Sequence, residues 1–274
     1  MTARQDVFQG GAAWFCCWAR SAIYLAAAAL FAAATSAAHA QTVKIVYTAS
    51  LFNVVALGDA HVEATFTPRA YAARTGMRTG GFARLFDDTE ISATSSGTVS
   101  GGALGWRLYG LEHSFARKFR RISMSRSAQA VSAAITPRFS DMGVPPATPA
   151  EQLASHDPLT AFVAMARAIG VQGACAGMFR VFDGRQHYRL TLSPKALGRY
   201  VGGGYDGAAL VCALRYTPVS GFGRRTPEDN ARIPEGEIWF ASPATDGFAA
   251  PLRIAAPTPA GELRIDMTSI SVAP

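Results

Sequence analysis

The sequence predicts an all-β fold with a single packed helix. About a dozen short runs rich in apolar residues are separated by Gly, Pro and Asp-Gly turns, a pattern typical of successive antiparallel strands. Only residues 157–170 place apolar side chains at helical spacing. The sequence contains no internal repeat. The Pro-rich stretch 143–149 is the one place suited to a domain boundary, and we interpret it as a crossing to the helix.

The first 40 of the 274 residues have the features of a secretory signal peptide. Arg4 and Arg20 precede an apolar block, SAIYLAAAALFAAATSAAHA, which ends in a small-x-small pattern at Ala40. We expect cleavage after Ala40 and export to the periplasm, with an uncleaved membrane anchor as the alternative. The domain prediction is therefore a signal peptide over 1–40 and a single β-rich envelope domain over 41–274. Cys16 and Cys17 would leave with the signal.

The charge of the chain is moderately basic. Loss of Arg4, Arg20 and Asp6 would change the formal charge from +7 to +6, because 26 − 2 basic and 19 − 1 acidic residues remain. This charge suits anionic lipid head groups, and it equally suits an ordinary solvated surface. Since no basic stripe alternates with aromatic residues, we expect no nucleic-acid partner. The mature histidines are far apart without Cys or His companions, and we expect no metal or other cofactor.

The first half of the mature chain predicts strands and hairpins divided by glycine turns. Residues 43–49, VKIVYTA, alternate with a period of two, and Gly58-Asp59 is predicted to separate the next two strands. The predicted runs are, in order, 43–49, 51–57, 61–66, 71–84, 85–110, 115–125 and 130–135, the last two forming a hairpin.

The predicted helix follows the Pro-rich connector 141–151. Asp157 is a good N-cap, Pro158 occupies the first helical position, and Gly170 is the expected stop. One face of the helix is apolar, with Leu159, Phe162, Val163, Ala166 and Ile169. We expect this face to pack against the sheet, with a partner-binding face as the alternative.

A β-meander bracketed by Cys175 and Cys212 follows the helix. Its predicted turns lie at Asp183-Gly184, Ser193-Pro194 and 202–204. In an exported chain the two cysteines predict a disulfide, with a reactive thiol pair as the alternative. Closing this loop of 37 residues would stabilise the fold by about 4 kcal/mol. After a polar loop at 224–236, the runs 237–241, 251–256 and 262–272 predict three more strands.

Residues 202–207, GGGYDG, match the G-x-G-x-x-G pattern of dinucleotide sites. That motif requires a strand before it and a helix after it, whereas the residues that follow resemble a strand as much as a helix. We therefore interpret the segment as a flexible turn.

Asp183 and His187 are the residues that an enzyme hypothesis would use. An Asp-Gly turn could bring them together as base and orienting group, with Arg185 nearby, for a hydrolase or transferase. The sequence has no G-x-S-x-G motif, because Ser100 lies one residue too late in 97–101. The alternative is an Asx-type turn at Asp183 with His187 hydrogen-bonded on the surface.

The densest basic run is 117–121. On a strand, Arg117, Phe119 and Arg121 would share one face, and Lys118 and Arg120 the other. The functional interpretation is contact of Arg117, Lys118, Arg120 and Arg121 with anionic lipid. The alternative is a solvated edge strand protected by its charge.

Four segments carry a resemblance to a known family. They are HDPLTAFVAMARAI, FDGRQHYRLTL, CALRYTPVSGFG and IWFASPATDGFAAPLRI. In this order they resemble the DUF3108 family of exported envelope domains of unknown function, over roughly residues 45–270. The resemblance implies an incompletely closed antiparallel barrel or β-spiral, similar to lipoprotein-carrier half-barrels, whose curved sheet wraps a helix and encloses an apolar concavity. The matching positions, taken as fold determinants, are Asp157, Pro158, Asp183, Gly184, Arg185, Tyr188, Cys212 and Tyr216.

The sequence favours a periplasmic protein that is not an enzyme and that binds a lipid or lipidated segment, including a lipoprotein, in the concavity. One alternative is an adaptor that binds another envelope protein through a sheet edge. The other is the hydrolase or transferase that uses Asp183 and His187. Membrane-surface contact is compatible with all three, and we expect no transmembrane span in the mature chain. The helix and the polar 224–236 loop fit an outer-membrane barrel poorly.

Overall fold

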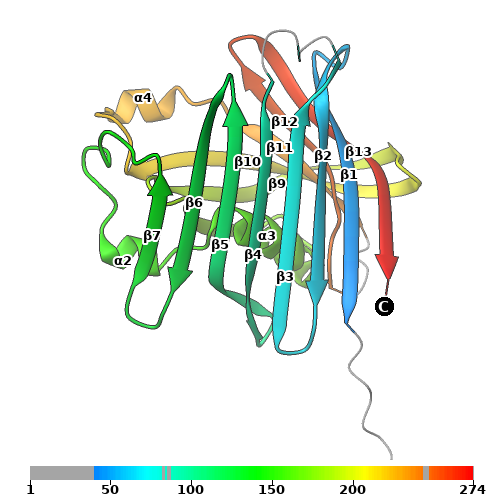
Figure 1. Ribbon diagram of the computed structural model, residues 1–274. Coiled ribbons are helices and arrows are strands. Elements are labelled where there is room, and N and C mark those ends of the chain that lie inside the picture. The colour runs from blue at the N-terminus through cyan, green and yellow to red at the C-terminus, as the bar shows by residue number, and fades with distance from the viewer. Residues whose placement is uncertain (1–39, 82–83, 85–87, 243–246, 274) are drawn as a thin grey trace, which may run out of the picture. The chain divides into compact units, whose positions relative to one another are not determined.

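The computed structural model describes residues 40–273, apart from 82–83, 85–87 and 243–246 (Figure 1). The predicted signal peptide lies outside the described residues except for Ala40. In the described part, thirteen strands form one antiparallel sheet in the order β7-β6-β5-β4-β3-β2-β1-β13-β12-β11-β10-β9-β8. The strands are β1 (Gln41–Leu51), β2 (Val55–Phe66), β3 (Ala70–Thr79), β4 (Glu90–Ser100), β5 (Ala103–Phe115), β6 (Lys118–Arg126), β7 (Val131–Thr136), β8 (Gly177–Phe182), β9 (His187–Gly202), β10 (Tyr205–Ser220), β11 (Gly236–Ser242), β12 (Pro251–Thr258) and β13 (Gly261–Ala273).

The sheet is open at one place, between β7 and β8. Every other pair of strands that follow each other in the sequence is paired, and β1 pairs with β13, so that Thr42 lies opposite Ala273. The connector 137–176 takes the place of a β7–β8 ladder and carries α2 (Pro149–Leu153) and α3 (Pro158–Gln172). The predicted fold class, an incompletely closed antiparallel sheet around one helix, is confirmed.

Helix α3 forms the centre of the core. The helix packs beside β3, β4 and β5 and also beside the edge strand β8 (Figure 1). The predicted apolar face is buried at Leu159, Val163, Ala166 and Ile169, while Phe162 is partly exposed. Strand β1 shows the matching alternation, with Val43, Ile45 and Tyr47 buried. The spacing of apolar residues in the sequence therefore predicted the buried face of α3 and the buried face of β1 correctly.

The predicted start of α3 is confirmed and the predicted stop is wrong. The Asp157 carboxylate accepts hydrogen bonds from the backbone N–H groups of Leu159 (3.0 Å) and Thr160 (2.9 Å). The helix continues past Gly170 to a left-handed C-cap at Gly173, with φ of 65°. Gly170 instead allows close packing, because a Cβ there would lie 2.4 Å from the carbonyl oxygen of Gly247.

Two predicted strand breaks are also wrong. Strand β2 runs through Gly58, where a Cβ would lie 2.0 Å from the carbonyl oxygen of Arg78, so this glycine permits close pairing with β3. The chain turns at 52–54 instead. Strand β9 runs through Ser193-Pro194, because its ladder with β8 ends at Leu192 and proline is tolerated where a strand has a free side.

The predicted disulfide between Cys175 and Cys212 is present, with Cα atoms 5.3 Å apart. It ties the end of the connector, just before β8, to the middle of β10. Two short helices, α2 and α4 (Pro227–Ala231), were not predicted. Both begin at a capping box, Thr148 with Glu151 and Thr226 with Asp229, a local signal that was available in the sequence.

Candidate functional site

An apolar cleft lies between α3 and the inner face of the sheet. It has a volume of about 290 Å³ and is lined mainly by Ile91, Leu111, Leu159, Phe162, Ile254 and Ile265. Leu159 is buried at its floor, whereas Ile91, Phe162, Ile254 and Ile265 are partly exposed. Helix α3 covers the inner face only in part, and the cleft is the part that it leaves open.

The polar side chains on the cleft wall are uncharged. The hydroxyl of Tyr47 donates to the carbonyl oxygen of Pro251 (3.0 Å), and that of Thr75 donates to the carbonyl oxygen of His61 (2.7 Å). Burial raises the pKa of Tyr47 and of Tyr109, so both phenols stay neutral. The wall can therefore hold an apolar group by burial and dispersion, and it offers no charge to a polar one.

A buried polar network fixes the helix beside the cleft. The Asp157 carboxylate accepts from the hydroxyls of Ser95 (2.9 Å) and Thr160 (2.5 Å), and the Tyr71 hydroxyl lies 2.6 Å from that of Thr160. Burial raises the pKa of Asp157, and these hydrogen bonds oppose the shift. The network joins β3 and β4 to the first turn of α3 and so sets the position of Phe162.

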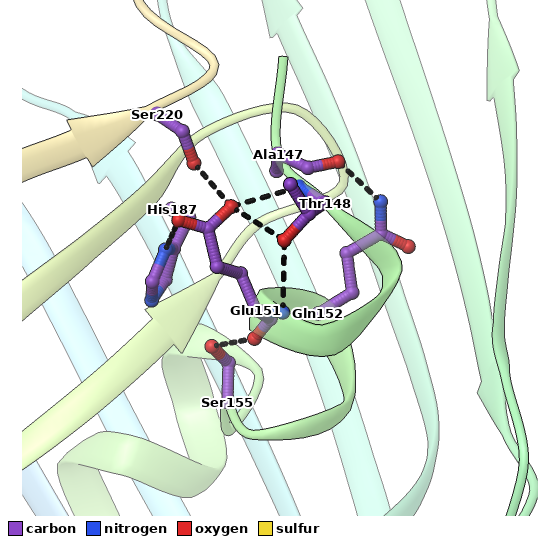
Figure 2. A network of polar contacts seen from close by, with 7 residues as sticks. All are labelled: Ala147, Thr148, Glu151, Gln152, Ser155, His187 and Ser220. Atoms are coloured by element: carbon purple, nitrogen blue, oxygen red, sulfur yellow. Dashed lines mark hydrogen bonds and ion pairs between the residues drawn. The ribbon is translucent and has the colours of Figure 1, made fainter. Parts of the chain in front are cut away.

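A second network, shown in Figure 2, joins α2 to the sheet. One carboxylate oxygen of Glu151 accepts hydrogen bonds from the Thr148 backbone N–H (2.8 Å) and from the Ser220 hydroxyl (3.0 Å), and its other oxygen lies 3.5 Å from Nδ1 of His187. Burial raises the pKa of Glu151, but the hydrogen bonds from Thr148 and Ser220 outweigh it and the pKa is lowered. Glu151 was missed in the sequence, although its capping box marks it.

His187 is buried, which corrects the expectation that it lies on the surface. Its exposed fraction is 4%, and neither ring nitrogen has a hydrogen-bond partner in the described part of the chain. Burial lowers the pKa of His187, and the nearby Glu151 carboxylate opposes this. Nδ1 of the imidazole faces the Glu151 carboxylate (Figure 2). Asp183 forms the expected Asx-type turn, accepting from the backbone N–H groups of Arg185 (2.9 Å) and Gln186 (2.7 Å).

The arrangement of these residues differs from a nucleophilic triad. A triad places the histidine between the nucleophile and the carboxylate. Here the Ser220 hydroxyl donates to Glu151, and the exposed fraction of Ser220 is 4%. His187 is therefore not aligned to take the proton of Ser220.

The basic residues of the run 117–121 lie in different surroundings. Arg117 lies in the β5–β6 turn with φ of 64°, so the expectation that it shares a strand face with Arg121 is wrong. The Arg120 guanidinium stacks 3.9 Å above the Phe139 ring, and Arg121 donates to Glu112 (2.9 Å). Lys118 begins β6 and is exposed. The hypothesis of an anionic-lipid contact at these residues stays a prediction.

The glycine-rich segment 202–207 forms the β9–β10 hairpin, with Gly203 and Gly204 at positive φ. A strand follows it rather than a helix, which agrees with its interpretation as a turn. In the described ranges no group of three or more His, Cys, Asp or Glu side chains is placed to hold a metal ion. Within the same ranges, no helix is long and apolar enough to cross a membrane.

Comparisons with known proteins match this architecture. Residues 46–268 match the model of a family described as "Protein of unknown function (DUF3108)". A similar solved structure is the β-barrel-like protein of the domain of unknown function DUF1849 from Brucella abortus. The TM-score is 0.51 and the identity 8%, over 85% of this chain and 98% of that one, which is a likeness of fold. No curated protein matches the sequence.

Proposed function

The chain belongs to the DUF3108 family of proteins of unknown function, and from its geometry we propose that it is a periplasmic, non-enzymatic protein that holds an acyl chain or a lipidated segment in the apolar cleft. The observation that carries this proposal is the cleft wall, which is aliphatic and aromatic, uncharged and partly open to solvent. Export is supported by the signal-like N-terminus and by the Cys175–Cys212 disulfide, which is typical of oxidising compartments.

The size of the cleft suits part of an acyl chain. Its volume of about 290 Å³ is close to the lower end of the range for small-molecule sites. Each methylene removed from water contributes about 0.8 kcal/mol, which is offset in part by the cost of ordering the ligand. Affinity would then depend on apolar length rather than on the head group.

The test compares a filled cleft with a matched control. Ala60 lines the cleft, and Ala60→Phe would place a ring in it without removing any core side chain. Ala196 is exposed on β9, and Ala196→Phe adds the same ring outside the cleft. Protein isolated from periplasm is analysed by native mass spectrometry and lipid extraction, and each variant is titrated with a fluorescent fatty acid.

We expect the Ala60→Phe variant to lose the co-purifying lipid and the fatty-acid binding, and the Ala196→Phe variant to keep both. Folded wild-type protein without lipid and without fatty-acid binding would overturn the proposal. So would binding that the Ala60→Phe variant retains.

A second candidate, the adaptor, is favoured by the free side of β9. The ladder with β8 ends at Leu192, and the following residues pair with β10 alone in the described part. Leu197 and Val201 in this stretch are 83% and 69% exposed. Such an edge can accept an added strand. A photo-crosslinker at position 197 in cells would give one discrete protein adduct if the adaptor hypothesis is right, and none or a diffuse smear if it is wrong.

A further inference from the structure

Two arginines face each other across the β8–β9 hairpin without a neutralising partner. Arg180 lies directly opposite Arg189 in the register, and both are exposed. Residues directly opposite in an antiparallel pair project from the same face of the sheet, and like charges in that position repel. Neither guanidinium has an ion-pair partner in the described part of the chain. By contrast, Arg74 and Arg121 each pair with a glutamate on a neighbouring strand.

Two threonines lie beside this pair on the same face. Thr217 lies opposite Arg189 on β10, and Thr191 follows Arg189 by two residues on the same strand. Arg215, opposite Thr191, adds a third guanidinium and has an ion pair with Glu235 at 3.6 Å. The carboxylate beside His187, that of Glu151, accepts hydrogen bonds from the Thr148 backbone N–H and the Ser220 hydroxyl. The face therefore combines unneutralised positive charge with hydroxyl donors.

We propose that this face of β8, β9 and β10 binds the phosphate groups of anionic phospholipids at a membrane surface, with Arg180 and Arg189 as the principal contacts. Arginine is well suited to phosphate because its planar guanidinium presents paired N–H donors. Met178, two residues from Arg180 and on the same face, is 47% exposed. Two arginines and an exposed apolar side chain on one sheet face suit a flat layer of head groups better than a single soluble anion.

The lowered pKa of His187 supports the location of the positive charge on this face of the sheet. His187 precedes Arg189 by two residues on the same face of β9, and both Arg180 and Arg189 act with burial to lower its pKa. Their positive potential thus extends to the Glu151 network. The site is independent of the apolar cleft, which lies against the inner face.

The experiment measures co-sedimentation of the full mature protein with vesicles. Wild-type protein is compared with R180Q/R189Q, with the charge-retaining R180K/R189K, and with R74Q/R84Q, which removes the same charge from ion-paired arginines elsewhere. Vesicles of phosphatidylglycerol mixed with phosphatidylcholine are compared with pure phosphatidylcholine, at low and high salt. Circular dichroism and the intact disulfide verify the fold of each variant.

We expect wild-type protein to bind anionic vesicles and to lose binding at high salt. Each arginine near such a surface contributes about fivefold in affinity, so R180Q/R189Q should bind roughly 30-fold more weakly. R180K/R189K should retain most of the affinity, and R74Q/R84Q should stay within a few-fold of wild type.

Unchanged binding by R180Q/R189Q would overturn the proposal, as would equal binding to neutral vesicles. If inorganic phosphate or a soluble phosphomonoester displaces the protein through the same arginines at low concentration, the membrane assignment is wrong and the ligand is a soluble phosphate compound. Because R180Q/R189Q leaves the cleft untouched, fatty-acid binding by that variant separates the failure of this proposal from the failure of the cleft proposal.

Discussion

Oε1 of Glu151 lies 3.5 Å from Nδ1 of His187, and this contact joins the connector to the first residue of β9. The connector occupies the opening of the sheet, so the pair anchors the segment that stands in place of a β7–β8 ladder. On the β8 side, the backbone N–H of His156 also donates to the carbonyl oxygen of Arg180 (2.9 Å). From β5 and β6, Trp106 and Arg126 donate to the connector at Ser155 and Leu153 (both 2.8 Å).

Stability should fall on mild acidification because of His187. Its pKa is lowered in the folded state, chiefly by burial, so the unfolded chain binds the proton more readily. The contribution of neutral His187 is complete above its ordinary pKa of about 6.5 and declines as the pH falls from there to the lowered value. Urea unfolding at a series of pH values should show this slope in wild-type protein. A His187→Gln variant should be flatter in that window, and an equal slope in both would contradict the assignment.

Removal of the Glu151 carboxylate should loosen the connector. Glu151→Ala leaves the Thr148 N–H and the Ser220 hydroxyl without their acceptor, a loss of roughly 1–3 kcal/mol in unfolding free energy. The matched control is Glu112→Ala, which removes an exposed ion pair with Arg121 and should cost less than about 1 kcal/mol. Chemical denaturation and hydrogen exchange at 148–156 measure both. Equal effects of the two variants would show that the Glu151 network does not hold the connector.

The buried network at the start of α3 should tolerate little change. Asp157→Ala removes the N-cap and leaves Ser95 and Thr160 unsatisfied, so we expect a loss of about 2–4 kcal/mol. Asp206→Ala, at an exposed ion pair with Arg199, is the control and should change stability by less than about 1 kcal/mol. Thermal unfolding followed by circular dichroism checks the difference, and a stable Asp157→Ala variant would mean that the network is dispensable.

Gly170 and Gly173 should respond to alanine for different reasons. At Gly170 the new Cβ would lie 2.4 Å from Gly247, so the backbone must shift and overpacking should cost about 1–3 kcal/mol. At Gly173 the space is open and only the left-handed φ of 65° opposes alanine, a cost of about 1 kcal/mol. Unfolding free energies of the two variants test the order, and the reverse order would contradict the close contact of α3 with 247–249.

Reduction of the disulfide should destabilise the protein without changing its fold. On the chain-entropy model, loss of the Cys175–Cys212 bond costs about 4 kcal/mol for a loop of 37 residues. A Cys175→Ser, Cys212→Ser double variant should show a lower urea midpoint and an equal or steeper slope, because the unfolded chain without the bond is less compact. Identical midpoints for the oxidised and reduced proteins would mean that the bond adds no stability.

The spacing of apolar residues along the sequence predicted the strands and the helix whose buried face shows as a regular repeat. The alternation of Val43, Ile45 and Tyr47 predicted β1, and the apolar face from Leu159 to Ile169 predicted the buried side of α3. The stop at Gly170 failed because a glycine that ends a helix and one that admits a neighbouring backbone look alike in sequence. Gly58 was misread for the same reason.

The candidate site was less predictable because it depends on pairing between distant segments. Glu151 and His187 are separated by α3 and β8, so their contact leaves no mark in local spacing beyond the capping box at Thr148. Likewise, Arg180 and Arg189 look like scattered charges until the register places them opposite each other. The apolar cleft followed from the family resemblance, and its location required the position of α3.

The pairing of β1 with β13 has a consequence for biogenesis. Thr42 and Ala273 are neighbours in the ladder, so the sheet can become continuous only when residues from both ends of the described chain are present. Contacts of such long sequence separation form slowly. If the protein is exported as proposed, β1 would remain incompletely paired until β13 has also crossed the membrane. In that interval its unpaired backbone would have to be shielded from wrong partners by a holding chaperone or by rapid completion of the crossing.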